Sequence, residues 1–247
     1  MSVEACAEIV RKGDSDRFLA AMAAPVPARA ALFPLYAFNV EIARAPFVSA
    51  EPMIGEMRLQ WWRDAVAEIA AGQRPRAHEV VAPLAEVMRG RDLPVALFDE
   101  MAEARRWDLF SDPFDGPDDL RRHLDRTAGH LMWLSSRALG GTDEAGARAV
   151  GLAQGLAAWL RAVPELEARG RHPWPDGAEA LIGPALDGLR AARAPGPAAP
   201  AWRAAWLAGP VLRQAQADPG RIRSGALGVS EFRRRTGLAR RAATGGW

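Results

Sequence analysis

The chain has 247 residues, of which 49% are hydrophobic, and a formal net charge of +2. A charge so close to neutral gives no reason to expect a nucleic-acid partner. A single cysteine, Cys6, excludes an intrachain disulfide and favours a reducing compartment. The N-terminal stretch lacks the apolar core of a signal peptide, and no segment approaches the length of a membrane span. We therefore expect a cytoplasmic protein that is at most peripheral to a membrane.

Alanine and leucine dominate the sequence and strand-forming residues are scarce, which predicts an all-α fold. In chain order, Asp14 or Ser15 can cap a first helix, and Pro25 and Pro27 end it. Further helices, each bounded by Gly, Pro or Asp, are predicted at about 31–46, 52–71, 78–89, 94–110, 117–139, 143–163, 178–192 and 201–217. This unbroken helical pattern favours one domain over residues 1–247.

The stretch 31–46, ALFPLYAFNVEIARAP, predicts a helix that is buried on nearly all sides. At about 100° per residue, Leu35, Tyr36 and Ile42 fall in one apolar stripe together with Asn39. A buried amide must find hydrogen-bond partners, because leaving it without them is energetically unfavourable. Asn39 is therefore either a satisfied core amide or a group that faces a ligand.

In the helix predicted at 52–71, the neighbouring side chains of Trp61 and Trp62 project about 100° apart. At most one of them can point straight into the core, and the other covers a seam or meets a partner. Exposed tryptophan and arginine are the residue types that anchor interfaces. We therefore expect Arg58, Trp62 and Arg63 to form a surface that recognises a partner.

Three motifs form a frame in these helices: Phe-Leu-Ala-Ala at 18–21, Leu-Tyr-Ala-Phe-Asn at 35–39 and Arg-Leu-Gln-Trp-Trp-Arg-Asp at 58–64. The frame resembles the squalene/phytoene synthase family of head-to-head prenyl transferases. The resemblance covers about 14–215 and leaves a basic C-terminal segment, 221–247, outside it. It implies a single-domain, isoprenoid-synthase-like helical bundle.

In that family, two aspartate-rich helices hold Mg²⁺ against a substrate diphosphate with carboxylates four residues apart, which share one helix face. The resemblance places the metal-binding positions of this chain at Ala43, Arg44, Phe47, Ala158, Ala162 and Leu166. None of them is a carboxylate, so we expect no metal site, no cofactor and no catalytic residue. Pro164, inside the second motif, predicts a kink or a stop in that helix.

Ala128 and Gly129 resemble the small residues that let a helix of the family pass close to the substrate, although close helix–helix packing explains them too. We expect Gly129 to line a pocket between the two motif helices together with Tyr36, Asn39 and Arg161.

One branch of the family has this frame with degenerate aspartate motifs and is related to a mitochondrial factor for assembly of respiratory complex I. The resemblance implies a non-catalytic assembly or maturation factor near the cytoplasmic face of a bacterial inner membrane, with a complex I subunit or assembly intermediate as its protein partner. An active prenyl transferase that uses Mg²⁺ and prenyl diphosphates, and a binder of an isoprenoid lipid, are the alternatives. The arginines of 221–241 form either a solvated, frayed last helix or an arm that contacts an acidic partner or anionic lipid.

Overall fold

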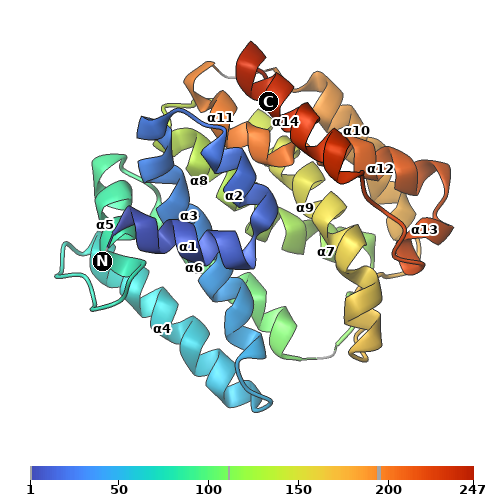
Figure 1. The fold of residues 1–247 in the computed structure, drawn as a ribbon. Helices are drawn as coiled ribbons and strands as arrows, with labels where there is room; N and C mark the ends of the chain where they lie inside the picture. Colours follow the sequence, from blue (N-terminus) through green and yellow to red (C-terminus); the bar gives the residue numbers. More distant parts are fainter. Residues whose placement is uncertain (1, 111, 194–195) are drawn as a thin grey trace.

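The computed structural model describes residues 2–110, 112–193 and 196–247, and within these ranges every regular element is a helix (Figure 1). The all-α prediction is confirmed. The first half of the chain forms α1 (Val3–Gly13), α2 (Ser15–Met22), α3 (Val26–Arg44), α4 (Pro52–Ala70), α5 (Val81–Gly90), α6 (Val95–Ala104) and α7 (Pro117–Leu124). The second half forms α8 (His130–Ala138), α9 (Glu144–Ala168), α10 (Ile182–Ala191), α11 (Ala199–Trp202), α12 (Ala208–Ala217), α13 (Gly220–Arg223) and α14 (Glu231–Thr244).

Shorter helical turns join these elements, and some of them divide helices that the sequence predicts as continuous. They are the 3₁₀ turns η1 (Ala45–Phe47), η2 (Arg105–Leu109), η4 (Ala178–Leu181), η5 (Gly196–Ala198) and η6 (Arg203–Ala205) and the π-helical turn η3 (Asp125–Gly129). The helix predicted at 94–110 tightens into η2, and the one predicted at 117–139 is interrupted by η3. Helix α1 is absent from the sequence-based expectations.

Two predicted helix boundaries, the cap at Asp14 and the stop at Pro164, can be compared with the structure. Asp14 caps α2, and its side chain accepts a hydrogen bond from the backbone N–H of Arg17 at 2.9 Å, as the sequence predicts. The stop predicted at Pro164 is wrong, because α9 continues to Ala168. Proline removes one backbone hydrogen bond, and the contacts of α9 with α10 and α12 offset that loss.

Helix α3 is the buried centre of the N-terminal half. Residues 31–40 are all buried, as is Ile42, which is the pattern of a helix surrounded on all sides. It contacts α1, α2, α5 and α8. The ring of Phe38 meets those of Trp62 and Phe98 edge-on, with centroids 5.5 and 5.3 Å apart. The burial predicted for this stretch is confirmed.

Helix α9 packs against η3 through small residues on both sides. A Cβ added to Gly155 would lie 2.5 Å from the Cβ of Ala128, and one added to Gly151 would lie 2.6 Å from the Ala128 carbonyl oxygen. Side chains larger than hydrogen do not fit at either glycine without a backbone shift. The small residues Ala128 and Gly129 therefore serve close helix packing, which is one of the two roles that the sequence allows.

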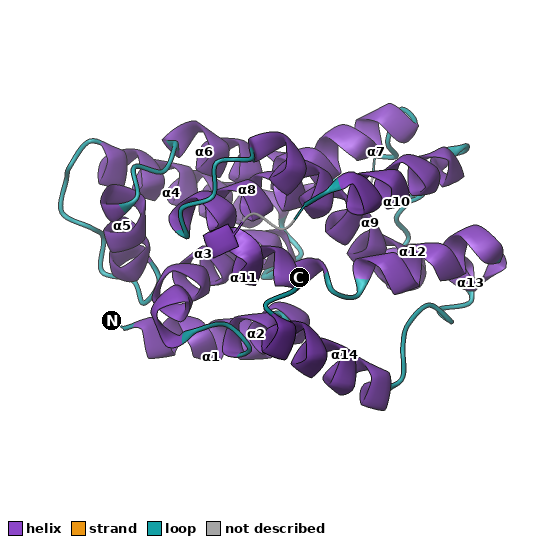
Figure 2. Cartoon of the chain, turned by 90° about the horizontal axis from the view of Figure 1, so that it is seen from above, coloured by secondary structure: helices purple, strands orange, loops and turns teal. Residues whose placement is uncertain are grey.

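The last helix, α14, folds back beside α2, and α1, α2 and α14 lie along one side of the molecule (Figure 2). Arg234 donates to Ser15 Oγ at 3.2 Å and also pairs with Asp16. The ring of Trp247 meets that of Trp202 edge-on at 5.2 Å. The basic segment therefore includes a helix that contacts α2 and is largely exposed, with Leu238 as its buried residue. Within the described ranges, no helix combines the length and apolarity needed to cross a bilayer.

Candidate functional site

A cavity of about 290 Å³ lies between the C-terminal half of α3 and the middle of α9. Its lining includes Ala43 and Phe47 from the first degenerate motif and Ala158, Ala162 and Leu166 from the second. The α9 residues are spaced four apart, so they share one face of the helix. Methyl, isobutyl and phenyl groups thus face one another across a space where paired carboxylates would hold a metal.

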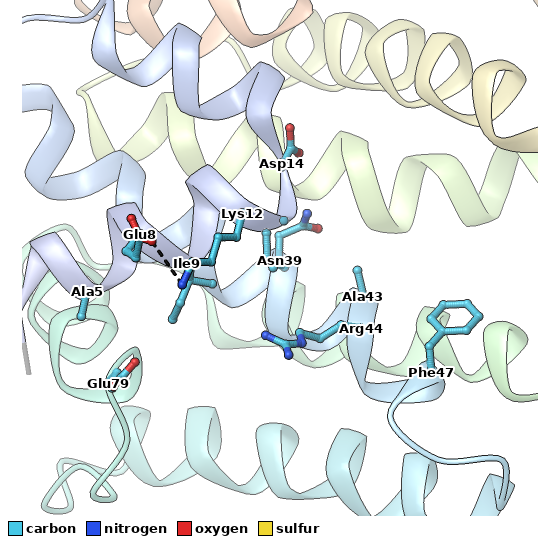
Figure 3. Close-up of a pocket in the computed structure, with 12 residues that line it drawn as sticks. Ala5, Glu8, Ile9, Lys12, Asp14, Asn39, Ala43, Arg44, Phe47 and Glu79 are labelled. Atoms are coloured by element: carbon cyan, nitrogen blue, oxygen red, sulfur yellow. Dashed lines mark ion pairs between the residues drawn. The ribbon is translucent and has the colours of Figure 1, made fainter.

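A second cavity of about 920 Å³ opens between α1 and α3 (Figure 3). Asn39, Ala43 and Phe47 line both cavities, so the two spaces adjoin along α3. Arg44 lines the larger cavity, and its Nη1 lies 3.3 Å from Glu41 Oε1. Of the six motif positions, this one alone turns away from α9.

The smaller cavity, which we call the central cavity, has two arginines in its otherwise largely apolar lining. Arg17 and Arg105 line it with a single carboxylate, that of Asp108. Arg105 Nη1 lies 3.6 Å from Asp108 Oδ2. Burial raises the pKa of Asp108, and the charge of Arg105 opposes that shift. Arg17 donates to Gln154 Oε1 at 2.6 Å and also pairs with Asp14.

His123 lines the same cavity from within an aromatic cluster. Its ring centroid lies 5.9, 5.5 and 5.3 Å from those of Trp107, Phe114 and Trp159. Burial, and secondly the charge of Arg105, lower the pKa of His123 to about 3. Among the described residues its Nε2 has no hydrogen-bond partner. The imidazole is therefore neutral at physiological pH. The sequence did not predict this cluster, because its four residues come from segments that share no common spacing.

The model of the squalene/phytoene synthase family matches residues 10–207 of the chain. The chain belongs to this family. Two similar curated relatives are named "NADH dehydrogenase (ubiquinone) complex I, assembly factor 6". The Bos taurus protein is 31% identical and the Homo sapiens protein 30%, each over 163 residues that cover 64% of this chain and 48% of the relative. The chain thus spans about half the length of the curated relatives it matches.

A solved dehydrosqualene synthase, crystallised in complex with a ligand, has a TM-score of 0.75 to this chain at 17% sequence identity. The match covers 98% of this chain and 95% of that one. At this identity the likeness shows a shared fold, and the chemistry has to be read from the residues of the cavity.

Those residues do not fit the Mg²⁺ cluster of the squalene/phytoene synthase family. Mg²⁺ takes oxygen ligands, chiefly carboxylates, in near-octahedral geometry. The central cavity offers the carboxylate of Asp108, which already faces Arg105. Arg17 and Arg105 would also repel a divalent cation. In the described part of the chain, no group of three or more His, Cys, Asp or Glu side chains is placed to hold a metal ion.

The pocket residues suggested by the family resemblance are only partly brought together. Asn39 lines the central cavity, and it also lines the larger one. Tyr36 is 2% exposed and lies in the core, while Gly129 is buried at the contact with α9. Arg161 pairs with Asp16 at 2.9 Å.

The partner surface predicted on α4 needs a correction, because Trp62 is buried. It is 4% exposed, and the buried face of α4 runs through Leu59, Trp62 and Ile69. Arg63 pairs with Asp99 and Glu103, at 2.6 Å each. Arg58 is exposed, as expected. From the sequence alone, either of the two adjacent tryptophans could point into the core. In the structure Trp62 does so, because its ring packs against that of Phe38.

Exposed apolar side chains gather instead where α3 connects to α4, at the lower edge of the molecule in Figure 1. Met53 and Met57, one turn apart on α4, are 71% and 66% exposed. The elements η1, α4 and η2 contact one another, so their exposed residues share this end of the bundle. We call the group the apolar tip; its members are Phe47, Val48, Met53, Ile54, Met57 and Phe110.

Proposed function

We propose that this protein is a non-catalytic member of the squalene/phytoene synthase family that serves as an assembly factor for respiratory complex I. One observation carries the loss of catalysis: the five motif positions that face the central cavity hold alanine, leucine and phenylalanine. Ionising a prenyl diphosphate requires neutralising the leaving pyrophosphate, which the family assigns to Mg²⁺. Without carboxylates that cluster does not assemble, so the protein works without a cofactor. The printed name of the curated relatives supports the assembly role.

The partner in this proposal is a complex I subunit or assembly intermediate at the cytoplasmic face of the inner membrane. The apolar tip supports protein contact, because an exposed apolar patch marks an interaction surface and methionine adapts to varied partners. Arg58 is exposed on the same helix. The arginines of segment 221–247 support peripheral contact with anionic lipid, at about 1 kcal/mol per cation near the surface.

A deletion strain of the source organism tests the assembly role. Deletion should lower assembled complex I and NADH:quinone activity while squalene-type and carotenoid-type products stay unchanged. Normal complex I together with missing isoprenoid products would refute the proposal and identify an active synthase.

Complementation of that strain tests the apolar tip. Met53→Lys/Met57→Lys should fold normally and fail to restore complex I, because both side chains are exposed and charge opposes burial against a partner. Met22→Lys/Val26→Lys is the matched control: these side chains are also exposed and lie near the other end of α3, about 27 Å away along a helix of this length. Equal rescue by the two variants would remove the tip from the proposal.

Turnover can be tested directly on purified protein. Incubation with farnesyl or geranylgeranyl diphosphate, Mg²⁺ and NADPH should release no more pyrophosphate than a boiled control. An isoprenoid-lipid binder is the second candidate, because the apolar cavity persists without its carboxylates. It predicts saturable binding of a prenyl diphosphate without turnover, and loss of that binding in Ala162→Trp, which narrows the cavity.

A further inference from the structure

A groove of about 470 Å³ between α12, α13 and α14 lies outside the central cavity. Arginines from all three helices converge on it: Arg213 from α12, Arg221 from α13, and Arg233 and Arg241 from α14. No aspartate or glutamate of the described residues lines it. The family model ends at residue 207, so the groove lies almost wholly in sequence beyond the matched frame.

In the part of the chain that the structure describes, the arginines of the groove have no aspartate or glutamate partner, whereas two other arginines of α14 do. On the same helix α14, Arg234 Nη1 lies 2.9 Å from Glu231 Oε1, and Arg235 Nε lies 3.8 Å from Glu231 Oε2. None of the four groove arginines forms an ion pair with a side chain in the described ranges. Arg221 donates to the backbone carbonyl of Ala226 at 2.6 Å. Arg241 donates to the carbonyl of Gly237 at 3.4 Å and to a main-chain oxygen of Trp247, the last residue of the sequence, at 2.9 Å.

Arg241 is affected by the positive charges near it, one of them in the groove and one outside it. Burial lowers the pKa of Arg241, and the charges of Arg240 and Arg213 lower it further. No carboxylate contributes to that shift. An arrangement that brings guanidinium groups together without a counter-charge is unfavourable for the chain alone, and it is relieved by an anion between them.

The wall of the groove also contains a buried donor. Trp206 lines the groove and is 3% exposed, and among the described residues its indole Nε1–H has no hydrogen-bond partner. A buried donor without an acceptor is unfavourable. The one uncharged polar side chain of the lining, Gln214, is occupied by the backbone of Gly228, with hydrogen bonds of 2.8 and 3.0 Å. The charged groups that line the groove are thus all donors.

We propose that this groove binds a phosphate or diphosphate group, carried either by a soluble compound or by an anionic lipid headgroup. Guanidinium groups pair with phosphate oxygens in bidentate fashion, and several of them together match the charge of a compact polyanion. Leu207, Pro210 and Val229 provide an apolar wall beside the arginines, suited to the rest of such a molecule. The site is separate from the central cavity, and its lipid form deepens the peripheral membrane contact proposed above for segment 221–247.

A pair of matched double variants tests the groove. Arg213→Ala/Arg233→Ala removes two groove charges, whereas Arg223→Ala/Arg235→Ala removes two exposed charges of α13 and α14 that do not line it. Both variants lower the net charge by the same amount. All four side chains are exposed, so the fold should survive, and circular dichroism and thermal unfolding check this.

The probes are inorganic pyrophosphate, titrated by calorimetry, and phosphatidylcholine vesicles with or without phosphatidylglycerol, assayed by flotation. We expect saturable binding of one probe. The groove variant should weaken it about tenfold or more, as loss of charge-assisted hydrogen bonds implies, and the control by less than about twofold. Pyrophosphate binding identifies a soluble phosphate compound, and binding to the phosphatidylglycerol vesicles alone identifies a lipid headgroup. Equal weakening in the two variants, or no binding of either probe by the unmodified protein, overturns the proposal.

Discussion

The neutral, buried imidazole of His123 makes the stability of the protein depend on pH in a defined window. The folded pKa is about 3 because of burial and the charge of Arg105, whereas an unfolded histidine titrates near 6.5. Below about pH 6.5 the unfolded chain therefore takes up a proton that the folded chain refuses. Stability falls as the pH drops from about 6.5 towards 3, and the contribution is constant above that range. Between pH 7 and pH 5 the loss from this one group is about 2 kcal/mol, at about 1.4 kcal/mol per pH unit.

Replacement of the ring isolates this contribution. His123→Phe keeps an aromatic side chain among Trp107, Phe114 and Trp159 but cannot titrate. Urea unfolding at pH 7 and pH 5 should show that the unmodified protein loses about 2 kcal/mol more than the variant over this interval. Asp108, whose raised pKa acts in the opposite direction, is present in both proteins, so its effect cancels in the difference. If the two proteins lose the same amount, the folded imidazole accepts a proton and the cavity is more polar than its lining indicates.

Two further predictions concern the core. Trp62→Ala should lower the free energy of unfolding by about 3–5 kcal/mol, since the ring is buried against Phe38. Met57→Ala, on the exposed side of the same helix, should change the free energy of unfolding by no more than about 0.5 kcal/mol. Similar losses for both variants would show that Trp62 lies at the surface. Gly151→Ala should destabilise by about 1–3 kcal/mol, because its Cβ would lie 2.6 Å from the Ala128 carbonyl oxygen. Gly183→Ala in α10 is the control, because no atom lies within 4 Å of the added Cβ; it should be neutral or stabilise the protein by up to about 1 kcal/mol. Equal losses of stability at the two glycines would contradict the packing described for α9.

Local patterns account for most of the fold. Helical propensity, the cap at Asp14 and the proline and glycine boundaries predict where helices begin and end, because these signals act within a few residues. The failures occur where tertiary contacts decide. Pro164 predicts a stop that the packing of α9 overrides, and the π-helical turn η3 has no marker among its residues 125–129. The choice between Trp61 and Trp62 also depends on Phe38, which belongs to another helix.

The candidate site was also only partly predictable from the sequence. The family resemblance places Ala43 and Ala158 on the two paired motif helices, and both line the central cavity. The charges that complete the lining, from Arg17 and Arg105, come from segments that carry no such spacing. The groove near α14 requires four arginines from three helices to meet, and a run of arginines in the sequence reveals their number but not their convergence.

The contact of Gly151 and Gly155 with Ala128 has a consequence for which positions of the central cavity tolerate exchange. These residues set the separation of η3 and α9 through main chain and methyl groups, and Ala128 and Gly155 themselves line the cavity. A larger side chain at either position would therefore move the cavity wall itself, because the two segments leave no room for it. The shape of the cavity thus depends on two of its smallest lining residues, whatever ligand it holds.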